Sequence, residues 1–556
     1  MLLPRFKHLI PSAIATAISL LSIAPTQAMP PPFEALPDVN YWTDLCRLQA
    51  NATDYENALK ACEQAIALEP KNADFWARHS GVLVSMEAFP DAIASANRAL
   101  TFDPENSLAI AYQCVAYTAL GENEIALDKC NDALRVNGNW GNENPALAWF
   151  YRGEILDQAQ QYELALVAYE RTLLLEPENS HVLTHQCQAY VVLERPQNAL
   201  DACGLALSID QNWGESSPAH ARTYQGQAHT QLSEYNQAIF AYDQAIGLDP
   251  NNALTWAAQG QVLETLHRDQ EALVSYDRAV AIKADYALAL LGQCTLLNRL
   301  KSYEPALAAC DAAIDGDSNW GNQSLANAWN ERSVALAGTQ QYEEALASIN
   351  RAVGIQPDYL AAHNHRSTIL WYLERYPEAL AANQQALYLD DTYAPAWFTR
   401  GLIFRATGQY PHALAAYNQA LALNPFNDWG WTNRSLVLWQ LEQYGDALDS
   451  AERAIALNSE SVQAWYNKGV ALSALGEYEG AIATYDKVIS LDATHVDALT
   501  GRGIAWFHLE DYAAATADLE AALALNPDNS LAQDTLTALA EAQPAESLSV
   551  PPPPPS

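Results

Sequence analysis

The chain has 556 residues, of which 50% are hydrophobic and 17% charged, and its formal net charge is −37 at pH 7. This hydrophobic fraction predicts an ordered protein with a buried core and excludes an intrinsically disordered chain. A surface this acidic repels the phosphates of nucleic acids and anionic lipid headgroups, so we expect no nucleic-acid binding. Basic or neutral partners are compatible with the charge, which otherwise serves solubility.

The first 28 residues have the pattern of a secretory signal peptide. Residues 5–8 include two basic side chains, an uncharged stretch follows to about residue 23, and small residues provide a cleavage site after Ala28. An uncleaved membrane anchor is the alternative, but the apolar stretch is short, contains Pro11 and is diluted by serine and threonine. No later segment is apolar enough to span a bilayer. We therefore expect an exported protein in which residues 29–38 form a short linker.

From Val39 to Asn529 the chain consists of fourteen copies of a repeat of 34 residues. The fourth place of the repeat is tryptophan in eight copies, and the eighth is always glycine, serine or cysteine. The seventeenth place is usually tyrosine, and the thirty-second is often proline. The twentieth place is always alanine: Ala58, Ala92, Ala126, Ala165, Ala199, Ala238, Ala272, Ala306, Ala345, Ala379, Ala413, Ala447, Ala481 and Ala515.

This pattern predicts two antiparallel helices in every repeat. Apolar residues recur at helical spacing, such as Trp465 and Leu472 on a first helix and Tyr485 and Val488 on its partner. Small residues at the eighth and twentieth places let the two helices approach closely. Proline near the end of the repeat stops the second helix and turns the chain.

The repeat resembles the tetratricopeptide repeat over about 490 of the 556 residues, matching that family's signature at Trp465, Gly469, Leu472, Tyr478, Ala481 and Tyr485. The resemblance implies an all-α fold, a right-handed α-solenoid of antiparallel helix pairs, whose concave groove holds peptides or protein segments. One place departs from the family. The seventh place of the repeat is often aliphatic in the family but is frequently arginine, lysine or glutamine in this chain. The ligand contacts of other members' grooves therefore cannot be carried over to this chain.

All eight cysteines occupy the eighth and twenty-fourth places of four repeats. The pairs are Cys46 with Cys62, Cys114 with Cys130, Cys187 with Cys203, and Cys294 with Cys310. These places lie on helix faces expected to touch, and the other ten repeats have cysteine at neither. We therefore predict four disulfides within repeats, each stabilising by about 3 kcal/mol in the chain-entropy model. Eight reduced thiols in a cytosolic protein are the alternative. The sequence contains neither a Cys-x-x-Cys redox pair nor a four-ligand zinc cluster.

Three repeats are five residues longer than the others. The inserted residues are 141–145, 214–218 and 321–325, and each insertion directly follows an Asn-Trp pair. The tryptophans are Trp140, Trp213 and Trp320. They could project as partner-binding aromatics. Alternatively, each could fold back and fill the gap that its own insertion creates.

Basic residues at the seventh place, including Arg332 and Arg400, are expected to align as a ladder with one member per repeat. Many repeats carry an acidic or amide residue at the twenty-fifth place, so pairing between the two places is one hypothesis. A cationic stripe that binds acidic peptides is the other.

No phosphate loop, nucleophile elbow or dinucleotide fingerprint appears, and the repeats leave no length for a catalytic domain. His181 and His185 are four residues apart, but no third metal ligand is evident, so we expect no metal site, no cofactor and no enzymatic activity. A capping helix is predicted over 530–541. The proline-rich residues 542–556 are expected to form a disordered tail.

The sequence thus predicts an exported, non-enzymatic scaffold or adaptor that binds protein or peptide clients through its groove. The periplasm, the extracellular medium or an equivalent lumen would be its location, with membrane association only through a partner complex. A periplasmic component of a polysaccharide-export or envelope-assembly complex is an alternative. A cytoplasmic enzyme regulator is another and would require reduced cysteines.

Overall fold

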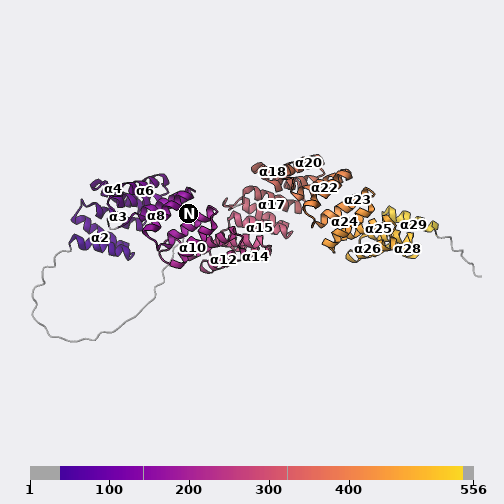
Figure 1. Cartoon of the computed structure of the whole chain (residues 1–556), viewed down its shortest axis with the longest axis horizontal. Coiled ribbons are helices and arrows are strands. Elements are labelled where there is room, and N and C mark those ends of the chain that lie inside the picture. The colour runs from indigo at the N-terminus through magenta and orange to yellow at the C-terminus, as the bar shows by residue number, and fades with distance from the viewer. Residues whose placement is uncertain (1–37, 142, 322, 543–556) are drawn as a thin grey trace, which may run out of the picture. The chain divides into compact units, whose positions relative to one another are not determined.

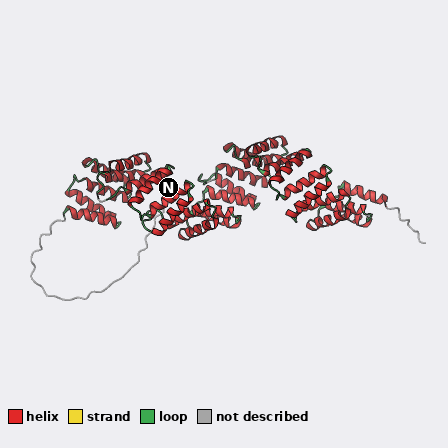
Figure 2. Cartoon of the chain, in the orientation of Figure 1, coloured by secondary structure: helices red, strands yellow, loops and turns green. Residues whose placement is uncertain are grey.

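A computed structural model describes residues 38–141, 143–321 and 323–542 (Figure 1). These residues form helices joined by turns and loops, with no strand among them (Figure 2). The predicted signal peptide and all but residue 542 of the predicted tail lie outside the described residues.

The described part of the chain contains 29 helices, and their bounds follow in chain order. They are α1 (Val39–Asn51), α2 (Tyr55–Leu68), α3 (Ala73–Ser85), α4 (Phe89–Phe102), α5 (Ser107–Ala119), α6 (Asn123–Val136), α7 (Ala146–Gln158), α8 (Tyr162–Leu175), α9 (Ser180–Val192), α10 (Pro196–Ile209), α11 (Pro218–Gln231), α12 (Tyr235–Leu248), α13 (Ala253–Thr265), α14 (Asp269–Ile282), α15 (Ala287–Arg299), α16 (Tyr303–Ile314), α17 (Leu325–Gly338), α18 (Tyr342–Ile355), α19 (Leu360–Tyr372), α20 (Tyr376–Leu389), α21 (Ala394–Ala406), α22 (Tyr410–Leu423), α23 (Asp428–Gln440), α24 (Tyr444–Leu457), α25 (Val462–Leu475), α26 (Tyr478–Leu491), α27 (Val496–His508), α28 (Tyr512–Leu525) and α29 (Ser530–Ala542).

The described residues divide into two compact units, one within 38–193 and 209–213 and the other within 194–208 and 214–542. Within each unit, an odd-numbered helix packs on the even-numbered helix that follows it, and that helix packs on the next odd-numbered one. Successive odd-numbered helices also touch, as α3 touches α5 and α15 touches α17. The fold is therefore the predicted α-solenoid of antiparallel helix pairs, and α29 packs on α28 at its end.

The turn inside each pair uses a residue in the left-handed conformation at the fifteenth place. Glycine occupies this place in three repeats, for example Gly476 with φ of 81°. The other repeats adopt the same conformation with other residues, for example Glu442 with φ of 61°. Left-handed backbone costs a non-glycine residue roughly 1–2 kcal/mol, so packing of the two helices imposes the turn even where the sequence does not favour it.

The tryptophans of the fourth place fasten one repeat to the next. The indole Nε1 of Trp76 donates to the carbonyl oxygen of Pro70 at 2.9 Å, and Trp256 and Trp431 bond Pro250 and Pro425 in the same way. The accepting carbonyl lies just beyond the end of the preceding helix, where backbone groups lack helical partners. These tryptophans therefore link each of these repeats to the preceding one by a hydrogen bond.

The eighth and twenty-fourth places form the closest contact inside each pair. Where the eighth place is Gly153 or Gly469, the twenty-fourth is a fully buried tyrosine, Tyr169 or Tyr485. A Cβ atom on Gly469 would lie 2.6 Å from the Tyr485 ring. Where the eighth place is serine, the residue at the twenty-fourth place is smaller than tyrosine. Ala96, for example, stands at the twenty-fourth place in the repeat of Ser80. A tyrosine ring at the twenty-fourth place thus lies where the opposed glycine leaves room for it.

Candidate protein-interaction surface

The paired cysteines occupy the contact that glycine and tyrosine fill elsewhere. Disulfides join Cys46 to Cys62, Cys114 to Cys130 and Cys294 to Cys310, with 5.2 Å between the Cα atoms in each case. Cys187 and Cys203 are disulfide-bonded as well, and no free cysteine occurs among the described residues. The cysteine pairs are therefore a third way of filling the volume between the eighth and twenty-fourth places, with a covalent bond in place of a large side chain.

The seventh-place side chains form hydrogen bonds or ion pairs with the twenty-fifth place of the preceding repeat. Arg332 Nε donates to Asp311 Oδ1 at 2.6 Å, and Arg400 Nη2 donates to Gln384 Oε1 at 3.0 Å. The same link recurs in the pairs Gln113–Asn97, Arg152–Asn131, Gln259–Asp243, Gln293–Asp277, Arg434–Asn418, Lys468–Glu452 and Arg502–Asp486. We call these contacts the inter-repeat ladder.

The ladder also reaches into its own repeat. Arg332 Nη1 donates to Ser348 Oγ at 2.7 Å, and the Arg332 guanidinium lies 5.5 Å from the Trp329 ring centre. Arg400 stacks on Trp397 at the same distance, and burial lowers its pKa. Both arginines proposed as partner contacts are thus held between repeats, which favours structural pairing over a cationic stripe.

The three inserted tryptophans differ in their packing. Trp140 is 8% exposed and packs with Ile110 and Ala111, while its indole donates to Asn137 Oδ1. Trp320 is partly buried against a cluster that includes Leu290 and Leu291.

The third tryptophan, Trp213, is partly buried, and its indole donates to Asp210 Oδ1 at 2.8 Å. The packing of Trp140 and Trp320 favours a structural role for the inserted loops.

The inserted loops also cap helices. The carbonyl oxygen of Asn139 accepts from the backbone N–H of Leu108, and that of Asn319 accepts from Leu288, both at 3.1 Å. Each accepted N–H belongs to the first turn of the first helix in the same repeat, where it has no helical partner. Gly141 and Gly321 follow with φ near 60° (62° and 58°), which turns the loop back.

A cavity of about 490 Å³ opens beside the first helices of repeats six to nine. Its lining comes from α11, α13, α14, α15, α17 and the loop before α17, and includes Glu264, Arg299, Gln323 and Glu331. We call it the α13–α17 cavity. Gln323 belongs to the third inserted loop, so this loop contributes a side chain to the cavity even though Trp320 packs inward.

One wall of the cavity carries a charged cluster. Arg299 Nη2 donates to Glu264 Oε1 at 2.9 Å, and Arg299 Nε lies 3.3 Å from Asp269 Oδ2. The Tyr276 hydroxyl donates to the other oxygen of Glu264 at 3.0 Å. Burial raises the pKa of Glu264 despite these partners. A single guanidinium is therefore shared by two carboxylates.

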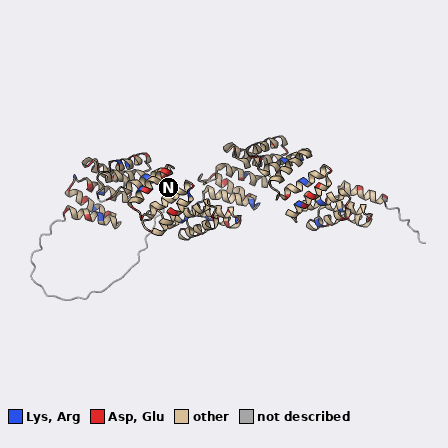
Figure 3. Ribbon diagram, viewed as in Figure 1, with Lys and Arg blue, Asp and Glu red and all other residues tan. Residues whose placement is uncertain are grey.

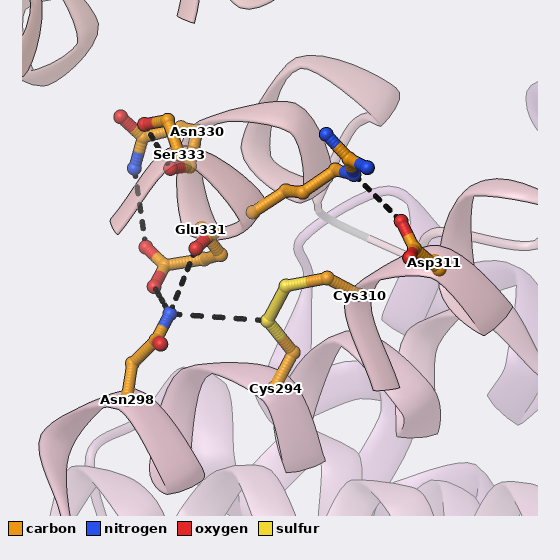
Figure 4. The surroundings of a disulfide bond; sticks show 8 residues. Cys294, Asn298, Cys310, Asp311, Asn330, Glu331 and Ser333 are labelled. Atoms are coloured by element: carbon orange, nitrogen blue, oxygen red, sulfur yellow. Dashed lines mark hydrogen bonds and ion pairs between the residues drawn. A yellow bond between two sulfur atoms is a disulfide. The ribbon is translucent and has the colours of Figure 1, made fainter. Parts of the chain in front are cut away.

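The other carboxylate, Glu331, is held by neutral donors (Figure 4). Asn298 Nδ2 donates to Glu331 Oε2 at 3.0 Å and to the Glu331 carbonyl at 2.9 Å, and Asn330 Nδ2 donates to Oε1 at 3.1 Å. Asn330 Oδ1 lies 2.8 Å from Nδ1 of the partly buried His365, whose pKa desolvation lowers to about 4. A polar chain, Asn298–Glu331–Asn330–His365, therefore crosses α15, α17 and α19.

The disulfide of the eighth repeat lies next to this chain. Figure 4 shows Asn298 between Cys294 and Glu331, and Asn298 Nδ2 is 3.9 Å from the Cys294 sulfur. Burial raises the pKa of the Glu331 carboxyl. The sequence analysis did not single out the four residues of this polar chain, although each is a polar residue on the first helix of its repeat.

Among the described residues, acidic side chains outnumber basic ones. They are dispersed over many helices (Figure 3). No group of three or more His, Cys, Asp and Glu in the described part is placed to hold a metal ion. None of the described helices combines the length and apolarity needed to cross a membrane.

Family models of the tetratricopeptide repeat match residues 43–107, 432–496 and 474–530, residues 394–427, and residues 220–252 and 326–359. The chain is a tetratricopeptide repeat protein. The prediction of this family and of its α-solenoid is confirmed. Its repeats are those of a scaffold for protein–protein interaction, a fold that is typically non-enzymatic.

Two curated relatives match this tetratricopeptide protein over part of their length. A DnaJ homolog subfamily C member 7 homolog of Dictyostelium discoideum is 22% identical over 207 residues, which are 35% of this chain and 38% of that protein. Serine/threonine-protein phosphatase 5 of Rattus norvegicus is 36% identical over 97 residues, 17% of this chain and 19% of that protein. The matches thus span well under half of either relative.

Among solved structures, the APC/C hetero-tetramer Cut9–Hcn1 is similar with 15% identity and a TM-score of 0.43, covering 91% of this tetratricopeptide protein and 97% of that chain.

Proposed function

We propose that this tetratricopeptide protein is an exported scaffold that catalyses no reaction. It binds segments of client proteins on the surface formed by the first helices of its repeats. The α13–α17 cavity is the observation that carries the proposal. It is a concave site of about 490 Å³ bordered by consecutive first helices, within the roughly 300–1,000 Å³ typical of ligand pockets. By contrast, the ladder arginines and the tryptophans Trp140 and Trp320 are occupied by contacts within the protein.

Export is the finer part of the proposal. Four disulfides require an oxidising compartment such as the periplasm, the extracellular medium or an equivalent lumen. The signal-like residues 1–28 lie outside the described residues and support export by composition alone. In the exported protein, residues 39–529 would form the repeats and 530–541 the capping helix.

Site-specific photo-crosslinking in living cells tests the binding surface. A benzoyl-phenylalanine placed at Thr295, which lines the α13–α17 cavity, is expected to crosslink to a client. The same probe at Val274, a 58% exposed position on α14, is the control. Crosslinks from Val274 but not from Thr295 would contradict binding at this face.

Mass spectrometry tests export. The expected result is a mature chain that begins after Ala28 and contains no free thiol. Eight free thiols together with an intact Met1 would place the protein in a reducing compartment and overturn this part of the proposal.

A further inference from the structure

We propose that the α13–α17 cavity binds a basic side chain, lysine or arginine, of the client segment. This inference rests on the proposed scaffold function and names the chemistry that one of its sites would recognise. It is carried by the charge of the cavity wall, by the hydrogen bonding of Glu331 and by a buried acceptor beside it.

The charge of the wall is the first step. Glu264 and Glu331 line the cavity. Asp269 lies within ion-pair distance of the Arg299 guanidinium that also binds Glu264. Arg299 is the partner of both Glu264 and Asp269. Three carboxylates therefore lie around one guanidinium, and a second cation would reduce the excess negative charge.

Among the described residues, Glu331 is the cavity carboxylate without an ion pair, although the charge of Arg299 also acts on it. Both of its oxygens accept from the amide groups of Asn298 and Asn330, and no ion pair to Glu331 occurs within the described residues. Amide donors orient a carboxylate but leave its charge in place. Taking such a charge out of water is costly unless an opposite charge accompanies it, so an incoming cation gains more here than at an exposed carboxylate.

Asn298 provides an independent observation. It is 7% exposed, and its Oδ1 is buried without a hydrogen-bond partner. The surroundings of Glu331 thus hold an acceptor in excess of their donors. Lysine and arginine side chains carry donors and no acceptors, so they match this excess, whereas an acidic side chain would add to it.

The size and edge of the cavity suit a side chain that enters from a bound segment. Glu264 is 25% exposed and Arg299 is 36% exposed, so the charged wall is accessible from solvent. Leu288 and Leu291 line another part of the cavity and can pack against the aliphatic stem of lysine or arginine.

Calorimetric titration of the full chain with model peptides tests the inference. The probes are acetylated, amidated peptides of alternating alanine and serine with one central lysine, arginine or acetyl-lysine. We expect the lysine or the arginine peptide to bind at least tenfold more tightly than the acetyl-lysine peptide. Glu331→Gln should remove that preference, whereas Glu304→Gln, at an exposed carboxylate on α16, should preserve it because both variants change the net charge equally.

Equal binding of all three peptides to the wild-type chain would overturn the inference without reference to any variant. Equal effects of Glu331→Gln and Glu304→Gln would also overturn it, provided that thermal melting shows both variants folded. Calcium chloride alone is a further arm, and tight calcium binding that Glu331→Gln abolishes would assign the site to a metal ion instead. Crosslinks from Thr295 without a lysine or arginine preference would leave the scaffold proposal intact and remove this one. A preference for the lysine or arginine peptide without crosslinks from Thr295 would support a site for basic side chains in the cavity and contradict the proposal that client segments bind there.

Discussion

Arg332 donates from Nε to a carboxylate oxygen of Asp311 across the boundary between the eighth and ninth repeats, at 2.6 Å. The same two places of the repeat are joined at eight further boundaries, although the residue types vary between arginine, lysine and glutamine on one side and aspartate, glutamate, asparagine and glutamine on the other. Because repeat proteins gain stability from interfaces between nearest neighbours, the ladder contributes to the cooperativity of the solenoid.

Replacing Arg332 tests that role. Arg332→Ala removes the bonds to Asp311 and Ser348 and the stacking on Trp329. Because the Arg332 side chain is 25% exposed, we expect a loss of about 1–2 kcal/mol. Hydrogen–deuterium exchange should become faster in α16 and α17, whereas Arg278→Ala, at an exposed arginine on α14, should leave exchange there unchanged. Equal exchange in both variants would contradict a structural role for the ladder.

The contact between the eighth and twenty-fourth places predicts opposite effects for two glycine substitutions. Gly469→Ala would put a Cβ atom 2.6 Å from the Tyr485 ring, and we expect it to destabilise its helix pair by about 1–3 kcal/mol. Gly204→Ala is the control because a Cβ atom there meets nothing within 4 Å. It should stabilise α10 by about 0.5–1 kcal/mol. Urea unfolding that shows the same sign for both would refute the argument that the Tyr485 ring leaves no room for a side chain at position 469.

The helix pairs and their closest contacts followed from the sequence because the period of 34 residues samples each contact fourteen times. Glycine, serine and cysteine at one place already indicate that two helices meet there. Repetition could not reveal the chain Asn298–Glu331–Asn330–His365, because its residues stand at places whose residue type varies from repeat to repeat. Glu331, for example, stands at a place that is tyrosine, histidine, asparagine or glycine in several other repeats.

The direction of the seventh-place bonds also needed the structure. The sequence pairs the seventh place with the twenty-fifth, but it does not say whether the two belong to the same repeat. The structure joins Arg400 to Gln384 of the preceding repeat, since the second helix of one pair packs on the first helix of the next. The inserted tryptophans were ambiguous for a similar reason, because a loop sequence does not determine which neighbour its aromatic ring will meet.

The equivalence of a cysteine pair and a glycine–tyrosine pair leads to a third prediction. Cys294→Ser with Cys310→Ser removes the covalent link in the eighth repeat, and we expect a loss of about 3 kcal/mol in the chain-entropy model. Cys294→Gly with Cys310→Tyr should recover part of that loss, because the seventh repeat fills the same volume with Gly260 and Tyr276. Thermal unfolding of both variants checks the order. A glycine–tyrosine variant no more stable than the serine variant would show that the two pairs are not equivalent.

Asp157, on the first helix of the fourth repeat, predicts a pH-dependent stability. Burial raises its pKa to about 6 from the usual value of 3.8, and its Oδ1 is buried without a hydrogen-bond partner. The folded protein therefore binds this proton more tightly than the unfolded chain does. The contribution of Asp157 to stability is fully present below about pH 4 and is lost as the pH rises through about 6.

Asp157→Asn removes that dependence. At pH 8 we expect the variant to be more stable than the wild type by about 1 kcal/mol, a value reduced because the side chain is only partly buried. The difference should shrink toward pH 4, where the wild-type carboxyl is protonated. Urea unfolding at both pH values checks this, with Asp128→Asn, at an exposed carboxylate on α6, as the control. A constant difference between Asp157→Asn and the wild type across this range would mean that the Asp157 carboxyl titrates alike in the folded and unfolded protein.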